Sequence, residues 1–147
     1  MNAIYRIRHI PLALLTLCLI PPMVSALTVE ELLAELPAKD SGHAAQLYEQ
    51  LAAGDETVII ALCDRVSLWT QDADPKTPMA LHGLANYVMR PGHGANRSKV
   101  ARLYEAALGK AGDLNIKRFF MELLRVCGDD QTVAIVAEYL CDADLYE

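Results

Sequence analysis

The stretch Arg90-Pro-Gly-His-Gly-Ala-Asn96 contains the two side chains best suited to chemistry, Arg90 and His93. Glycines flank the histidine on both sides, so the stretch is expected to be an exposed loop between two helices. Such a loop can present an imidazole and a guanidinium together to an anion. The alternative is an ordinary solvated turn. Arg90 and His93 are therefore candidate anion-binding residues.

Trp69 is the single tryptophan of the chain and a further candidate for binding. In the stretch Ser-Leu-Trp-Thr-Gln-Asp its ring suits a sugar or a peptide, and the alternative is a lid over the ends of helices. Asp72 and Asp74 begin a stretch like a calcium loop, but the central glycine and the glutamate at the twelfth position are lacking. No hydrolase, metalloprotease, P-loop or dinucleotide motif is present. The sequence thus predicts no catalytic residue, metal or cofactor.

Three cysteines, Cys63, Cys127 and Cys141, follow the N-terminal apolar segment, so at most one internal disulfide can form. Cys127 and Cys141 flank one expected helix of about ten residues, which separates them by about 15 Å. That distance is too long for a disulfide. The cysteines are expected to be small buried apolar residues. His82, in the middle of a helical pattern, is expected to be a partly buried structural histidine.

Residues 1–26 read as a secretory signal peptide, with Arg6 and Arg8 before a short apolar run and small residues up to Ala26. The alternative is an uncleaved N-terminal anchor. Cleavage after Ala26 leaves 11 basic and 19 acidic side chains, a formal net charge of −8. An acidic chain repels nucleic acid. The prediction is an exported protein of the periplasm or cell envelope, without nucleic acid and without a stable membrane span after cleavage.

Hydrophobic periodicity divides the remaining chain into helices, and no segment alternates with period two over the length of a strand. Thr28 and Glu31 form a predicted capping box, Thr77, Asn96 and Asp130 are predicted N-caps, and Gly109 is a predicted stop. The sixth helix, with the widest stripe, is expected to be central. The seven apolar stripes cover residues 29–36, 44–51, 59–66, 81–88, 100–108, 116–127 and 133–140.

Three of these helices begin alike, with a polar turn before Val58, Val100 and Val133, which lie 42 and 33 residues apart. Helix pairs that repeat at this length build α-solenoids. Residues 119–147 resemble a junction of the HEAT-like, armadillo-type α-helical repeat family, and the resemblance covers roughly residues 55–147. The positions that carry the resemblance are Leu123, Leu124, Gly128, Asp129, Val133, Leu140, Asp142 and Leu145.

The resemblance implies an all-α fold, an α-solenoid of antiparallel helix pairs with about seven helices after the signal peptide. Residues 27–54 would form an N-terminal helical hairpin that caps the stack, and residues 55–147 the HEAT-like repeats. The last repeat is expected to be incomplete, because its second helix only begins near Asp142 and Leu145. The chain is then the N-terminal part of an exported repeat protein. The alternative is a natural end with a polar tail. If the repeat is incomplete, the sixth and seventh helices present bare apolar surface to water.

Stacked amphipathic helices without a catalytic pattern favour an exported, non-catalytic binding or scaffold module, whose curved face holds a protein partner or an adjacent domain. The alternative is a spacer or docking arm of a larger exported enzyme, with a catalytic or carbohydrate-binding domain beyond Glu147. Self-association through the open C-terminal end is a third possibility.

Overall fold

The computed structural model describes residues 27–68 and 74–139, and these residues form helices and turns without a strand. The prediction of an all-α fold is confirmed for these residues. The predicted signal peptide (1–26), Trp69, and Leu140 with the predicted helix opening after it lie outside the described residues. The helices are α1 (Val29–Ala34), α2 (Ser41–Ala53), α3 (Glu56–Ser67), α4 (Lys76–Val88), α5 (Gly94–Lys110), α6 (Leu114–Cys127) and α7 (Asp130–Tyr139).

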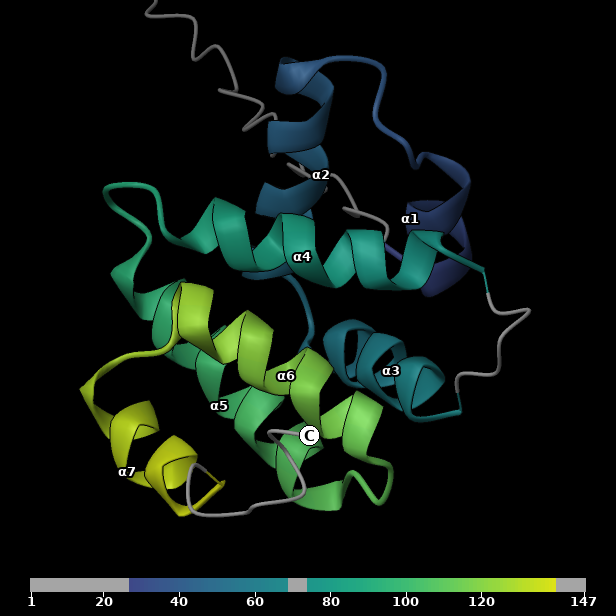
Figure 1. The fold of residues 1–147 in the computed structure, drawn as a ribbon. Coiled ribbons are helices and arrows are strands. Elements are labelled where there is room, and N and C mark those ends of the chain that lie inside the picture. Colours follow the sequence, from purple (N-terminus) through teal and green to yellow (C-terminus); the bar gives the residue numbers. More distant parts are fainter. Residues whose placement is uncertain (1–26, 69–73, 140–147) are drawn as a thin grey trace, which may run out of the picture.

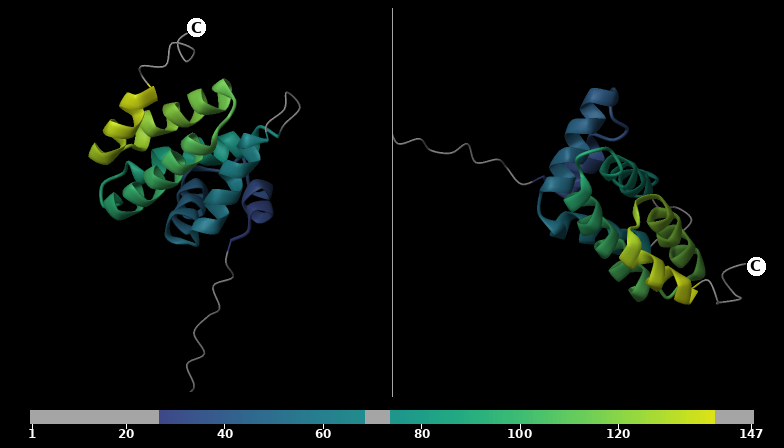
Figure 2. Two further views of the ribbon diagram at one scale, coloured as in Figure 1. Left: turned by 90° about the horizontal axis from the view of Figure 1, so that it is seen from below. Right: turned by 90° about the vertical axis from the view of Figure 1, so that its left-hand side faces the viewer.

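The helices are arranged in space roughly in the order of the sequence. Helix α4 crosses the middle of the molecule and contacts α1, α2, α3, α5 and α6 (Figure 1). Helices two apart in the sequence also contact each other, namely α3 with α5, α4 with α6, and α5 with α7. The N-terminal helices α1 and α2 therefore lie at one end and α7 at the other (Figure 2).

The width of the apolar stripe predicted that the sixth helix would be central, and this is wrong, because α4 takes the central position (Figure 1). Helix α6 lies beside it. Its apolar side is covered by α4 and α5, which are its main neighbours. The prediction that this helix presents bare apolar surface is wrong for its main stripe, because those two helices exclude water from it. The buried residues of α6 are Ile116, Phe119, Phe120, Leu123, Leu124 and Cys127.

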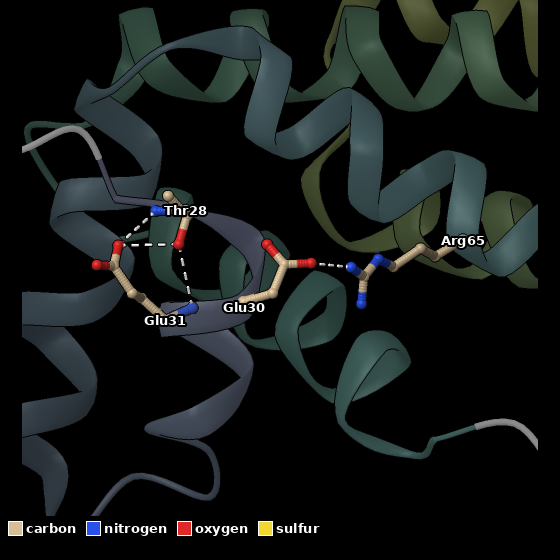
Figure 3. A network of polar contacts seen from close by, with 4 residues as sticks. All are labelled: Thr28, Glu30, Glu31 and Arg65. Atoms are coloured by element: carbon tan, nitrogen blue, oxygen red, sulfur yellow. Dashed lines mark hydrogen bonds and ion pairs between the residues drawn. The ribbon is translucent and has the colours of Figure 1, made fainter.

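Polar contacts fix the first described helix, α1 (Figure 3). The backbone N–H of Thr28 donates to the Glu31 carboxylate at 2.9 Å, and the backbone N–H of Glu31 donates to the Thr28 hydroxyl at 3.2 Å. This is the predicted capping box. The Thr28 hydroxyl also donates to the Glu31 carboxylate at 2.9 Å, and the two bonds that this carboxylate accepts, the one from the Thr28 backbone first, lower the pKa of Glu31. Glu30, which precedes Glu31 in α1, forms an ion pair with Arg65 of α3, so the short first helix is tied to the third.

Two of the predicted N-caps lie inside their helices. Thr77 lies inside α4 and is buried, and the N-cap position of that helix is Pro75, which makes no side-chain cap bond. The Asp74 carboxylate just before it accepts the backbone N–H of Lys76 at 2.9 Å. Asn96 lies inside α5, because that helix already begins at Gly94. The predicted positions were wrong because a helix start depends on local turn geometry that periodicity does not record.

Two boundaries near the C-terminal helices also differ from the prediction. The carboxylate of Asp129, not of Asp130, caps α7, since it accepts the backbone N–H of Gln131 at 3.0 Å. Gly109 does not stop α5, which continues to Lys110. Among the described residues, no helix has the length and apolar character needed to cross a membrane.

Candidate functional site

The loop between α4 and α5 brings the two predicted anion-binding residues to one aromatic ring. The guanidinium carbon of Arg90 lies 5.1 Å from the centroid of the Tyr87 ring, and the His93 ring centroid lies 4.7 Å from it. Tyr87 is only 5% exposed, so it is a fixed part of α4. A cation near a ring face is attracted by the ring quadrupole. Tyr87 therefore gathers both side chains, although the sequence analysis did not single it out.

These contacts attach the loop to the body of the protein. The Tyr48 ring of α2 lies 6.3 Å from the Tyr87 ring, so aromatic contacts continue from α2 through α4 to the loop. Burial, and secondarily the charge of Glu49, raise the pKa of Tyr87. Arg90 is exposed and His93 is half-buried. The contacts give both side chains a structural role, and anion binding stays a prediction.

A groove of about 530 Å³ lies between α6 and α7. Apolar side chains form most of its surface, and charged side chains stand on its rim. Val133 of α7 is 67% exposed, and Thr132 is the one residue of that helix that is buried. The expectation of apolar surface on the seventh helix is thus confirmed for Val133. The lining residues are Met121, Glu122, Leu124, Arg125, Gly128, Asp129, Thr132, Val133, Val136 and Ala137.

The groove is open because α7 packs mainly against α5 rather than against α6. The contact with α5 is polar. The hydroxyl of Thr132 donates to the Glu105 carboxylate at 2.5 Å, and the Ser98 hydroxyl donates to the Asp129 carboxylate at 2.9 Å. The bond from Ser98 is the main reason why the pKa of Asp129 is lowered. Polar bonds from one side thus hold α7, and Val136 and Tyr139 add partial contact with the core, while Val133, Val136 and Ala137 line the groove.

The turn before α7 is held from the same side. The Nε of Arg97 on α5 donates to the carbonyl oxygen of Cys127 at 3.0 Å, and another guanidinium nitrogen donates to the carbonyl oxygen of Gly128. A cation at the C-terminus of a helix also complements the helix dipole. Arg97 therefore sets the direction in which the chain leaves α6 and enters α7.

A second cleft, of about 230 Å³, lies beside α5 and the start of α7. Its charged side chains are engaged within the protein. Arg102 pairs with Glu56 at 3.2 Å, and the Lys99 ammonium donates to the carbonyl oxygen of Gly54 at 3.2 Å. Glu105 holds Thr132, as described above. We interpret this polar cleft as a tether between elements, in contrast to the apolar groove on the other side of α7.

The described residues offer no evident site for catalysis. No group of three or more histidine, cysteine or acidic side chains among them is arranged to hold a metal ion. Cys63 and Cys127 are buried, as predicted, and burial raises the pKa of each thiol to about 12. Such thiols are protonated at neutral pH and are poor nucleophiles. His82 is half-buried, and its ring meets Phe119 edge-on at 5.3 Å, which fits the predicted structural role.

Comparison with protein-family models, with curated proteins and with solved structures found no match for this chain. The apolar pattern of residues 133–140 predicts that Val133, Val136 and Ala137 share one face of a helix. It could not show that this face would border a groove, because the other wall comes from α6.

Proposed function

We propose that the chain is an exported, non-catalytic binding module that holds a protein segment in the α6–α7 groove. The observation that carries the proposal is the open apolar groove, with the exposed Val133 on its edge and charged side chains on its rim. Grooves of this kind take an amphipathic helix whose apolar face lies in the groove. A small ligand is less suited, because such ligands are bound in sites that enclose most of their surface.

We further propose that the helices form an α-solenoid of antiparallel pairs, HEAT-like in type. The contacts of α3 with α5, α4 with α6 and α5 with α7 support this arrangement, since stacked helix pairs bring helices two apart together. The positions of α1 and α7 at opposite ends support it as well. Export to the periplasm or cell envelope rests on the sequence of residues 1–26.

The binding energy available to the groove comes mainly from its apolar side chains. Burying one large apolar side chain contributes about 1.5–3 kcal/mol. Val133 is 67% exposed and Val136 is partly exposed, so a partner that covers both removes apolar surface from water. The sequence predicts that a curved face of the stack binds the partner. The proposal limits the binding site to the α6–α7 groove, near one end of the stack.

Site-specific photo-crosslinking tests the proposal. A photoreactive residue placed at Val133 in the full chain, in its native cell, is expected to give a defined adduct, and mass spectrometry identifies the protein in it. The matched control is Ala106, an exposed residue of α5 outside the groove. Absence of an adduct at Val133, or the same adducts at Ala106, contradicts the proposed function.

A variant tests whether the apolar groove causes the capture. Val136→Asp places a charge in the groove wall, so a crosslink formed from Val133 is expected to disappear. Val136 is only partly buried, and circular dichroism checks that the variant keeps its helices. A crosslink that persists in this folded variant argues against the groove as the binding site.

A further inference from the structure

We infer that the segment bound in the α6–α7 groove belongs to a second copy of this chain, which docks about a two-fold axis. The inference rests on the proposed function, because it names the protein that the groove binds. It is carried by the charges on the groove rim and by the position of Val133.

The rim carries both signs of charge. Glu122 and Arg125 stand on α6, and Asp129 stands at the turn before α7. Glu122 and Arg125 are exposed, and neither forms an ion pair or a hydrogen bond with another described residue. They are three residues apart in a helix and therefore lie on the same face. The groove thus offers an unpaired acid and an unpaired base side by side.

A two-fold interface requires a surface that is complementary to itself, since the same patch is used by both copies. When α6 lies antiparallel to its copy, Arg125 of one chain comes level with Glu122 of the other, and the pair occurs twice. A partner with one dominant sign of charge would instead meet a like charge on the rim. The mixed rim therefore favours a second copy over a strongly basic or strongly acidic partner.

The apolar surface of the groove is also complementary to itself. Val133 projects at one edge of the groove, and Met121, Leu124 and Val136 lie within it. Two-fold docking places Val133 of each copy against the groove of the other, so a projection and a hollow are paired twice. The surface is confined to one short helix and one side of another, which is small for a stable interface of about 1,200–2,000 Å². The expected complex is a weak dimer that forms as concentration rises.

Sedimentation velocity of the purified chain from micromolar to millimolar concentration measures the dimer. Arg125→Glu and Glu122→Arg are each expected to weaken association about tenfold or more, because each variant creates two like-charge contacts in its own dimer. An equimolar mixture of the two variants is expected to recover wild-type association, because acid again faces base at both contacts. Lys110 is exposed and lies outside the groove, so Lys110→Glu is the control for Arg125→Glu, with the same change of charge. This variant is expected to associate as the wild type does.

The outcomes separate this inference from the proposed function. Recovery in the mixture, with both single variants impaired, supports the two-fold dimer. A chain that stays monomeric while Val133 crosslinks to a different protein overturns the inference and leaves the proposed function intact. A monomer whose Val133 crosslinks within its own chain overturns it as well, since the occupant is then a segment such as residues 140–147. A dimer that is insensitive to Arg125→Glu and Glu122→Arg also overturns it.

Discussion

Helices α6 and α7 follow one another in the chain, and both have an apolar face, but they are held in different ways. Helix α6 buries six apolar side chains against its neighbours. Helix α7 buries Thr132 and leaves Val133 67% exposed. The first is part of the core, whereas the second is attached to the core through polar contacts with α5.

The difference between α6 and α7 shows how a stack of helices can be stable and still bind a protein segment. Apolar burial supplies most of the stability of the body of the molecule, because it removes large side chains from water permanently. The polar attachment of α7 leaves much of its apolar face uncovered, because only Val136 and Tyr139 of that helix pack partly against the core. That face, with the adjacent side of α6, then remains available to another protein segment.

The largest effect is expected for a change in the core of α6. Phe120 is fully buried, and its ring lies 5.4 Å from the Phe119 ring and 6.2 Å from the Tyr104 ring. Phe120→Ala removes these contacts and leaves a cavity, so the free energy of unfolding should fall by about 3–5 kcal/mol. Urea denaturation measures the free energy of unfolding. Val133→Ala is the matched change in α7 and should cost less than about 0.5 kcal/mol. Equal losses in the two variants would remove the contrast between the helices.

An intermediate effect is expected at the polar attachment of α7. Thr132→Val keeps the volume of the side chain but removes the hydroxyl that donates to Glu105. The loss of this buried bond should favour local opening of α7 by about 1–2 kcal/mol. Hydrogen exchange should then quicken roughly 5–30-fold in α7 and stay unchanged in α6. Uniform acceleration in both helices would mean that α7 is not a separate unit.

The smallest effect is expected at Asp129, and it depends on pH. The folded pKa of Asp129 lies below its ordinary value of 3.8, mainly because of the bond from Ser98. Its contribution to stability is therefore fully present above pH 3.8 and is lost as the pH falls through the lower folded pKa. Asp129→Asn should be slightly less stable than the wild type at pH 7, and the difference should shrink in acid. Denaturation at several pH values measures it, with Asp64→Asn, at an exposed residue of α3, as the control. A difference that grows in acid would contradict the assigned cause.

Sequence patterns were sufficient where a structure depends on neighbours along the chain. The stripe of Ile59, Leu62, Cys63 and Val66 is buried in α3 as its period predicts. The capping box at Thr28 is likewise local, because both of its hydrogen bonds join residues three apart. The cap of α7 was placed one residue late, since adjacent aspartates are equally suitable by type and only the turn decides between them.

Sequence patterns were insufficient where contacts join distant segments. Arg90 and His93 were named together because they are close in sequence, but the ring that gathers them, Tyr87, became evident only from the structure. The link from Thr132 to Glu105 joins residues 27 apart, and no local pattern indicates it. The α6–α7 groove was missed for the same reason.

The sequence by itself determined that the chain is helical, where its helices approximately begin and end, and which residues of most helices are apolar on one side. These properties follow from periodicity and capping, which act within a few residues. Only the tertiary structure decided which apolar side is covered. The apolar side of α6 packs against α4 and α5 and is buried. Helix α7 contacts α5 through polar side chains, and its Val133 stays exposed to water. Burial depends on what lies opposite a helix face, and that is a property of the whole fold.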